Sequence, residues 1–289
     1  MTEHAALLDV AREAVAKATE IVRSRPSFSV SAKGDRDLVT DVDTAVEDAL
    51  REFLAAETPE IGILGEERGR SGDGGGRWWA LDPIDGTANF ARGIPLCGIS
   101  LALVDGEHST VAAITLPYLG VTYTAARGEG TFANGKRVGA STATEMSDAM
   151  IAVGDFAIGE LAEEKNRARM TLLSELGARA QKIRMLGTAA IDLAWVADGK
   201  LDAALILSNN PWDTMAGVLL VREAGGVVVD RDGSEHTVGS AATIAVGAGL
   251  RKEIVDALDR AYGVVRLDSG VHRGRRHSAL LRCPPRDFG

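Results

Sequence analysis

The strongest constraint on the fold is a change in hydrophobic pattern near residue 149. Before it, short apolar runs bounded by Gly or Pro predict β-strands, and Asn134-Gly135 predicts a type I′ hairpin. After it, runs of strand length alternate with segments of helical spacing, which is typical of an α/β arrangement. The first part has expected strands at 61–64, 78–81, 97–104, 110–116 and 121–126. The second part has expected strands at 150–153, 183–185, 203–207, 227–229 and 243–246, and expected helices at 160–177, 188–198, 213–224 and 249–262. We therefore expect an α/β fold with an α+β N-terminal half and an α/β C-terminal half.

Two helices are expected ahead of these strands. Apolar side chains at helical spacing predict amphipathic helices over 5–23 and 43–56. The polar stretch between them, which contains Lys33, predicts a loop or a hairpin. Gly72 to Gly76 lacks the strand-to-helix context of a nucleotide-binding loop, so it predicts a flexible turn.

The 289 residues are enough for roughly two domains. We place an N-terminal half at 1–148, which holds the Lys33 loop, and a C-terminal half at 149–265, with no internal repeat and no long linker. Residues 266–289 are rich in arginine and predict a disordered basic tail. The tail fits either an uncommitted solvated terminus or a segment that binds an acidic partner.

Net charge limits the range of partners. With 32 Lys and Arg against 41 Asp and Glu, the chain carries a formal charge of −9, which disfavours broad binding to nucleic acids or anionic membranes. No apolar stretch approaches the roughly 20 residues that span a bilayer, and the N-terminus has no signal-peptide pattern. Two cysteines, Cys97 and Cys283, cannot form a disulfide framework. We therefore expect a cytoplasmic protein that binds neither membrane nor nucleic acid directly.

Paired carboxylates form the densest group of reactive residues. Asp82 follows an apolar run that Pro83 is expected to stop, and Asp85 comes three positions later, with Gly86 and Thr87 directly behind. Two carboxylates on one tight turn repel each other unless a cation lies between them, and Mg²⁺ prefers oxygen ligands of this kind. The backbone N–H groups of Gly86 and Thr87 would be free to approach a phosphate. The alternative is an Asx-turn, in which both aspartates accept hydrogen bonds from local amides.

Three further acidic residues occur in similar settings. Glu66 follows an expected strand, whereas Asp43 and Asp213 stand where helices begin. Taken singly, Glu66 is interpreted as a solvated surface charge and the two aspartates as helix N-caps. Together with Asp82 and Asp85 they could instead form one cation-binding site.

These segments together resemble the inositol monophosphatase family of Mg²⁺-dependent, lithium-sensitive phosphomonoesterases. Trp79 to Phe90 matches the first signature of the family, and Trp212 to Gly226 matches the second, in the right order with Gly65-Glu66-Glu67 and Leu38-Val39-Thr40. The likeness runs from about residue 5 to about residue 262. One departure is Met215, where the family usually has a small residue. The resemblance implies a five-layered α/β/α/β/α sandwich of the inositol monophosphatase and sugar phosphatase type, assembled as a homodimer.

The resemblance also implies a site with two to three Mg²⁺ ions. The first ion would be held by Glu66, Asp82 and the carbonyl of Ile84, the second by Asp82, Asp85 and Asp213, and a third, weaker ion by Glu66 and water. The implied catalytic residues are Asp43, Thr87 and Glu66, with Asp43 orienting Thr87 so that the pair helps to activate a water molecule. The implied substrate-binding residues are Lys33, Asp85, Gly86, Thr87, Ala189, Ile206 and Asp213.

Ile206 is the main departure on the substrate side. Many inositol-preferring members have a glutamate seven residues before the second-signature aspartate, and this chain has Ile206 there. An apolar side chain cannot accept a hydrogen bond from a polyol. Either Ser208, Asn209 and Asn210 replace that contact or the substrate is not inositol. Asp155 and Phe156 are further candidates for the pocket, with a plain loop position as the alternative.

The resulting hypothesis is a Mg²⁺-dependent phosphomonoesterase. It would hydrolyse a small phosphorylated alcohol, such as inositol monophosphate or a related sugar, histidinol or nucleoside phosphate, with an activated water and no covalent intermediate. The alternative is a regulatory or interaction protein of the same family, whose phosphatase activity is dispensable.

Overall fold

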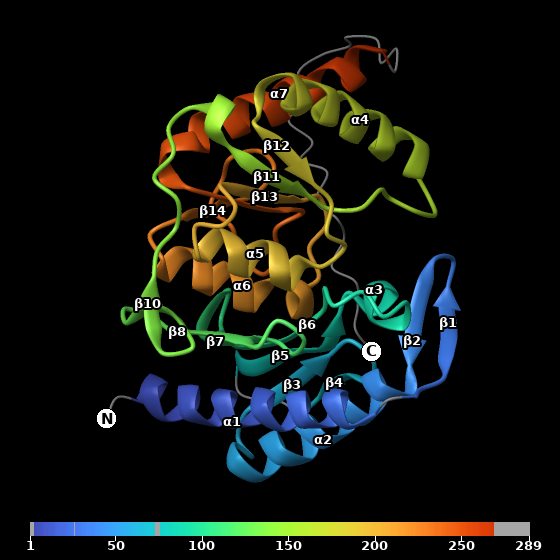
Figure 1. Ribbon diagram of the computed structural model, residues 1–289, viewed down its shortest axis with the longest axis vertical. Coiled ribbons are helices and arrows are strands. Elements are labelled where there is room, and N and C mark those ends of the chain that lie inside the picture. The colour runs from blue at the N-terminus through green and yellow to red at the C-terminus, as the bar shows by residue number, and fades with distance from the viewer. Residues whose placement is uncertain (1–2, 26, 73–75, 269–289) are drawn as a thin grey trace.

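The computed structural model describes residues 3–25, 27–72 and 76–268. Its helices and sheets are stacked in five layers, which alternate as helices, sheet, helices, sheet, helices (Figure 1). The predicted α/β/α/β/α sandwich is therefore confirmed. The helices are α1 (Glu3–Ser24), α2 (Asp41–Glu57), α3 (Thr87–Ala91), α4 (Ala162–Arg179), α5 (Ala189–Ala197), α6 (Pro211–Glu223) and α7 (Arg251–Asp268).

The larger sheet has eight strands in the order β10-β9-β8-β7-β6-β5-β3-β4. All neighbours in it are antiparallel except β3 and β5. Asn134 and Gly135 have positive φ angles of 46° and 77° between β9 and β10, which confirms the predicted hairpin. The strands are β3 (Gly62–Gly65), β4 (Gly69–Ser71), β5 (Arg77–Asp85), β6 (Gly98–Asp105), β7 (His108–Leu116), β8 (Val121–Ala126), β9 (Gly130–Ala133) and β10 (Lys136–Val138).

The smaller sheet has five strands in the order β12-β11-β13-β15-β14. Strands β12, β11 and β13 are parallel, whereas β15 runs antiparallel to both of its neighbours. The strands are β11 (Met150–Val153), β12 (Lys182–Arg184), β13 (Ala203–Ile206), β14 (Val227–Val229) and β15 (Thr243–Val246).

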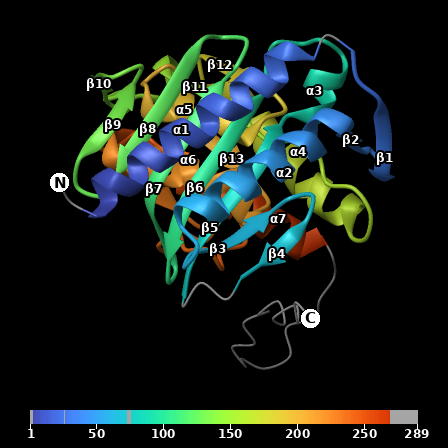
Figure 2. The same cartoon turned by 90° about the horizontal axis from the view of Figure 1, so that it is seen from below.

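The layers are held together by three apolar cores. Successive residues of β5 point to opposite faces of the sheet, so Trp79 packs towards α1 and α2, whereas Trp78 packs towards α5 and α6. Figure 2 shows α1 and α2 lying across the outer face of this sheet. The third core lies between the smaller sheet and helices α4 and α7. Helices α5 and α6 are apolar on nearly all sides because sheets cover them on both faces.

A two-stranded hairpin extends beside the sandwich and consists of β1 (Val30–Gly34) and β2 (Asp37–Thr40) (Figure 1). The Lys33 segment, for which the sequence allowed a loop or a hairpin, is therefore a hairpin. Near its turn Arg36 donates a long hydrogen bond of 3.5 Å to the carbonyl of Ala157 in the C-terminal half. The expected flexible turn at Gly72 to Gly76 and the expected basic tail fall largely outside the described residues. The first residues of the expected tail, 266–268, are helical instead and continue α7. None of the helices in the described ranges is both long and apolar enough to cross a membrane.

Candidate active site

A bulge in β5 places the paired aspartates. Asp82 is opposite Ser100 of β6, and the next opposed pair is Asp85 with Gly98, so Pro83 and Ile84 lie outside the regular register. The expectation that Pro83 stops the strand is therefore wrong. Proline removes one backbone donor, which interrupts the ladder, and β5 resumes pairing at Asp85. The side chain of Asp82 accepts a hydrogen bond from the Ile84 N–H at 3.0 Å, as the Asx-turn interpretation predicted.

The first turn of α2 positions a carboxylate against Thr87. Thr40 is the N-cap, and the buried Asp43 accepts a hydrogen bond from the Thr40 N–H at 2.8 Å to complete a capping box. The other oxygen of Asp43 accepts from the Thr87 hydroxyl at 3.1 Å. Thr87 Oγ1 is also 3.0 Å from the carbonyl of Ile84. The N-cap interpretation of Asp43 itself is wrong, because Asp43 occupies the third helical position.

Glu47 fixes the segment that carries Glu66. This fully buried carboxylate accepts hydrogen bonds from the backbone N–H groups of Glu67 at 2.7 Å and Arg68 at 2.9 Å. Its approach requires a glycine at position 65, since a Cβ there would lie 2.2 Å from Glu47 Oε1. Sequence reasoning missed this positioning residue. The available signal was an acidic residue on the apolar face of α2, four positions before its partner Arg51.

Five carboxylates, which we call the acidic face, come from separate parts of the chain: Asp43, Glu66, Asp82, Asp85 and Asp213. Lys33 reaches this face from the β1–β2 hairpin. Its Nζ atom is 2.8 Å from Glu66 Oε1 and 2.8 Å from Glu67 Oε1. Burial alone would lower the pKa of Lys33, but the hydrogen bonds to these two carboxylates raise it above its usual value. Glu66 is thus an ion-paired group rather than the free surface charge of the alternative interpretation.

Two helix starts in the C-terminal half complete the acidic face. Asp85 accepts hydrogen bonds from the Thr188 hydroxyl and from the Ala190 N–H, both at the beginning of α5. Asp213 is the third residue of α6 and accepts from Asn210 Nδ2 at 3.0 Å. The N-cap interpretation of Asp213 is also wrong, because Asn210 is the N-cap. The acidic face therefore lies where the two halves of the chain meet.

Burial and mutual repulsion shift the pKa values of several of these carboxylates. Burial, followed by the charges of Glu66, Asp85, Asp213 and Asp43, raises the pKa of Asp82 well above its usual value. Burial raises the pKa of Asp213 to about 8, with the charge of Asp85 adding to the shift. Burial also raises the pKa of Asp85 to about 6, although hydrogen bonds from α5 oppose the change. Such a cluster is electrostatically unfavourable unless positive charge enters it.

The chemistry of this cluster fits a hard cation. Within the residues that the structure describes, no three His, Cys, Asp or Glu side chains are already grouped so that they could hold a metal ion. One oxygen of each of the carboxylates of Glu66, Asp82 and Asp85 accepts a hydrogen bond from the protein itself. Carboxylate oxygens and the buried repulsion around Asp82 suit a hard divalent cation.

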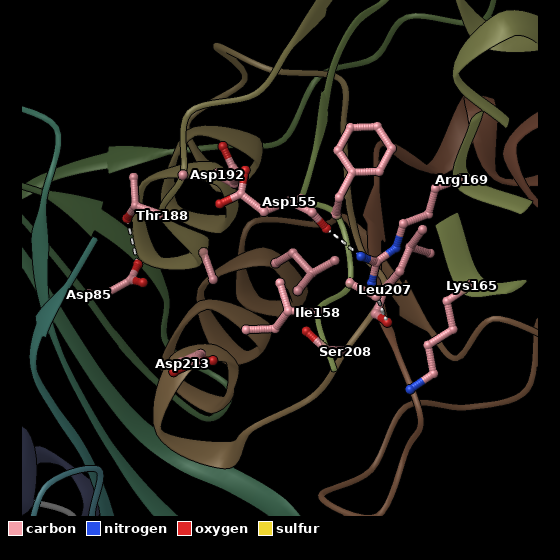
Figure 3. Close-up of a pocket in the computed structure, with 16 residues that line it drawn as sticks. Asp85, Asp155, Ile158, Lys165, Arg169, Thr188, Asp192, Leu207, Ser208 and Asp213 are labelled. Atoms are coloured by element: carbon pink, nitrogen blue, oxygen red, sulfur yellow. Dashed lines mark hydrogen bonds between the residues drawn. The ribbon is translucent and has the colours of Figure 1, made fainter. Parts of the chain in front are cut away.

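A cavity of about 410 Å³ opens beside the acidic face (Figure 3). Asp85 and Asp213 lie at one side of it, and Ile206, at the end of β13, contributes to its wall. Ala189 also lines the cavity, as do both loop candidates, Asp155 and Phe156.

The polar residues after β13 have different roles. Ser208 lines the cavity, whereas Asn209 is occupied within the protein, because its amide donates to the carbonyls of Val238 and Ser240. Asn210 binds Asp213. Of the three candidates to replace a missing glutamate, only Ser208 faces the cavity.

Three charged residues of the cavity were missed. They are Lys165, Arg169 and Asp192, which come from α4 and α5. No motif marks them, although Lys165 and Arg169 are four positions apart and so share one face of their helix.

The family model for the inositol monophosphatase family matches residues 3–261. The chain belongs to this family. "Inositol monophosphatase 1" of Solanum lycopersicum is 34% identical over 260 residues, which cover 87% of this chain and 94% of the relative. "Nus factor SuhB" of Escherichia coli (strain K12) is 32% identical over 268 residues, which cover 88% and 99%. The crystal structure of the extragenic suppressor protein suhB from Bartonella henselae superposes with a TM-score of 0.83 at 32% identity, covering 88% of this chain and 99% of that one.

Membership of the inositol monophosphatase family makes this protein a phosphoric monoester hydrolase by class, as the sequence predicted. Met215, which departs from the family pattern, is fully buried in the core around α5 and α6. That departure therefore changes core packing rather than the acidic face.

Proposed function

We propose that this protein hydrolyses the phosphate monoester of a small polyol or a related phosphorylated alcohol with the help of Mg²⁺. The observation that carries the proposal is the buried Asp82 carboxyl, surrounded by Asp43, Glu66, Asp85 and Asp213 from separate segments. A cluster of this kind next to a cavity is expected at a site that binds cations and a charged substrate.

The proposed ligand sets are those that the family resemblance implies. Glu66, Asp82 and the carbonyl of Ile84 would hold one Mg²⁺, and Asp82, Asp85 and Asp213 a second, with a weaker third at Glu66. When bound, the ions would supply positive charge for the phosphate and lower the pKa of an attacking water to about 7. Inhibition by lithium is part of the same proposal.

Thr87 and Asp43 would guide the proton of the attacking water. The Thr87 hydroxyl donates to Asp43, so its oxygen is free to accept a proton-donating water from the cleft. Burial raises the pKa of Asp43, which makes this carboxylate a better proton acceptor than a solvated one. The water oxygen would form the new bond to phosphorus as the ester bond breaks.

A covalent intermediate is not part of the proposal. Burial raises the pKa of the Cys97 thiol to about 12, so this group is a thiol rather than a thiolate at neutral pH. Direct attack by water is therefore the simpler route.

Gly86 would bring the backbone close to the phosphate. Its φ of 86° is in the left-handed region, and a Cβ there would lie 3.0 Å from the Leu96 carbonyl. Gly86 is the N-cap of α3, and no described side chain caps this turn. The N–H groups at Gly86 and Thr87 would thus be available to phosphate oxygens.

The cavity wall formed by Ala189 and Ile206 would determine which substrates are accepted. Ala189 and Ile206 present apolar surface, which argues against an inositol held by a carboxylate at this position. A cytoplasmic homodimer remains the proposed state of the protein.

Phosphate release from a substrate panel tests this function. We expect hydrolysis of at least one monoester with Mg²⁺ and none with a chelator. Asp82→Asn should reduce kcat/KM by about 10³-fold or more, because it removes the shared ligand, whereas the exposed Asp256→Asn should have no effect. Full activity of Asp82→Asn, or no hydrolysis of any substrate, would sink the proposal.

A regulatory role is the second candidate, favoured by the relatives named Nus factor SuhB. On this alternative the protein would bind transcription machinery, and its phosphatase activity would be dispensable. Cells that carry Asp82→Asn would then keep full function, and the variant would still bind its partner. Loss of cell function in Asp82→Asn would exclude the alternative.

A further inference from the structure

Arg169 is a buried cation without a counter-ion. The residue is 6% exposed and belongs to α4. Its guanidinium donates to two backbone carbonyls, of Asp155 at 2.5 Å and Leu207 at 3.2 Å, while its Nε has no hydrogen-bond partner. No carboxylate in the described part of the chain forms an ion pair with it. Burial of an unpaired charge is costly, so such a group calls for an anion.

Lys165 lies one helical turn before Arg169 and lines the same cavity. Its ammonium makes no ion pair or side-chain hydrogen bond to any residue that the structure describes. Figure 3 shows both cations on the side of the cavity remote from Asp85 and Asp213. The cavity therefore has an acidic end, at Asp85 and Asp213, and a basic end, at Lys165 and Arg169.

The carboxylates near the basic end form no ion pair with Lys165 or Arg169 in the described residues, although burial lowers the pKa of Arg169 and the charge of Asp155 partly opposes that shift. Asp155 turns its Oδ2 towards the start of α5, 3.8 Å from where a Cβ of Gly187 would lie. Asp192 is 2% exposed, and within the described residues its carboxylate makes no ion pair with Lys165 or Arg169. Neither cation is therefore paired with a carboxylate in the part of the chain that the structure describes.

We propose that Lys165 and Arg169 form an anion-binding subsite, which holds a second negatively charged group at the end of the substrate remote from the cleaved phosphate. The inference rests on the proposed function and names its substrate class: a phosphorylated polyol or sugar that also carries a carboxylate or a second phosphate. A volume of about 410 Å³ is within the range of small-molecule sites. Arginine binds either group through paired N–H donors, and lysine adds a point charge.

The competing explanation is that Arg169 only ties the loop at Asp155 to the end of β13. Lys165 separates the two explanations, because its side chain makes no hydrogen bond or ion pair within the described structure. Arg167, on the same helix and exposed outside the cavity, provides a matched control for loss of one positive charge.

A substrate pair that differs in one distal charge provides the test. Gluconate 6-phosphate and glucitol 6-phosphate differ only in a carboxylate or a hydroxymethyl group at the far end. We expect the wild type to prefer gluconate 6-phosphate, with the difference mainly in KM. Lys165→Met should reduce the ratio of kcat/KM between the two substrates about 10-fold, which is the usual size of a charge-assisted contact, whereas Lys165→Arg should retain most of it. Arg167→Met should leave the ratio unchanged.

Binding measurements keep this inference separate from the proposed function. Calorimetry with gluconate 6-phosphate, glucitol 6-phosphate and glucitol 1,6-bisphosphate gives a Kd for each compound whether or not it is hydrolysed, and shows whether the subsite prefers carboxylate or phosphate. Tighter binding of the doubly anionic compounds, lost in Lys165→Met, supports the subsite even if hydrolysis fails. Equal Kd values for all three, or equal effects of Lys165→Met and Arg167→Met, would overturn it.

Discussion

The acidic face and the basic end of the cavity differ in how firmly the protein holds them. Asp43, Asp85 and Asp213 each accept hydrogen bonds from a helix start or its capping residue. The basic end depends on α4 and the loop before it, where Ile158 is 40% exposed. Asp43 and Asp85 each accept at least two hydrogen bonds. At the basic end Arg169 donates two, whereas the side chain of Lys165 makes none within the described residues. Lys165 can therefore change with less cost to the fold than Asp43 or Asp85.

The largest expected effect tests the acidic face. Thr87→Val keeps the shape of the side chain but removes the hydroxyl between Asp43 and the cleft. We expect kcat to fall about 10³-fold with little change in KM, because proton transfer and not binding is lost. Steady-state kinetics with Thr87→Ser as a control, which should keep most of the activity, checks this. A loss below about 10-fold in Thr87→Val would show that the hydroxyl has no role in the reaction.

A smaller effect is expected on the cavity wall. Ile206→Glu should raise kcat/KM for inositol 1-phosphate about 10-fold over the wild-type value, because it provides an acceptor for the inositol hydroxyls. Ile206 is 7% exposed, so the melting temperature must be measured alongside, and Ile206→Gln serves as the uncharged control. If neither variant changes the preference, Ile206 does not explain the choice of substrate.

The smallest effect concerns the contact between the hairpin and the acidic face. Lys33→Met removes the cation that pairs with Glu66, so we expect Mg²⁺ to bind about 3-fold more tightly. Calorimetric titration of Mg²⁺ measures this, with Lys17→Met, which breaks an exposed pair with Glu13, as the control. Weaker or unchanged Mg²⁺ binding in Lys33→Met would mean that Lys33 does not compete with the metal.

The order of helices and strands was predictable because it depends on local sequence, whereas the five-layered sandwich and the set of acidic positions came from the family resemblance. Asn134-Gly135 determines its own turn, and the two family signatures carry Asp82, Asp85 and Asp213. The bulge at Pro83 was not predictable, since strand pairing beyond a proline depends on the partner strand.

The roles of Glu47 and Arg169 could not be predicted from the sequence, because both depend on long-range contacts. Glu47 acts on the backbone beyond Gly65 through a contact across the fold, and Arg169 acts on two loops that only the tertiary structure brings to it. The spacing of Glu47 and Arg51 places both on one face of α2, but it does not show that Glu47 binds the backbone beyond Gly65. Spacing along a helix shows which face a residue occupies but not what lies opposite.

Lys33 has a consequence for the protein between rounds of catalysis. Because this lysine bonds to Glu66 and Glu67, part of the repulsion in the acidic face is relieved by the chain itself. If the reaction depends on Mg²⁺ as proposed, a fall in this ion would leave a folded, dormant enzyme rather than a damaged one, and restoring the ion would reactivate it without refolding. Through the β1–β2 hairpin, the supply of magnesium would then control the reaction reversibly.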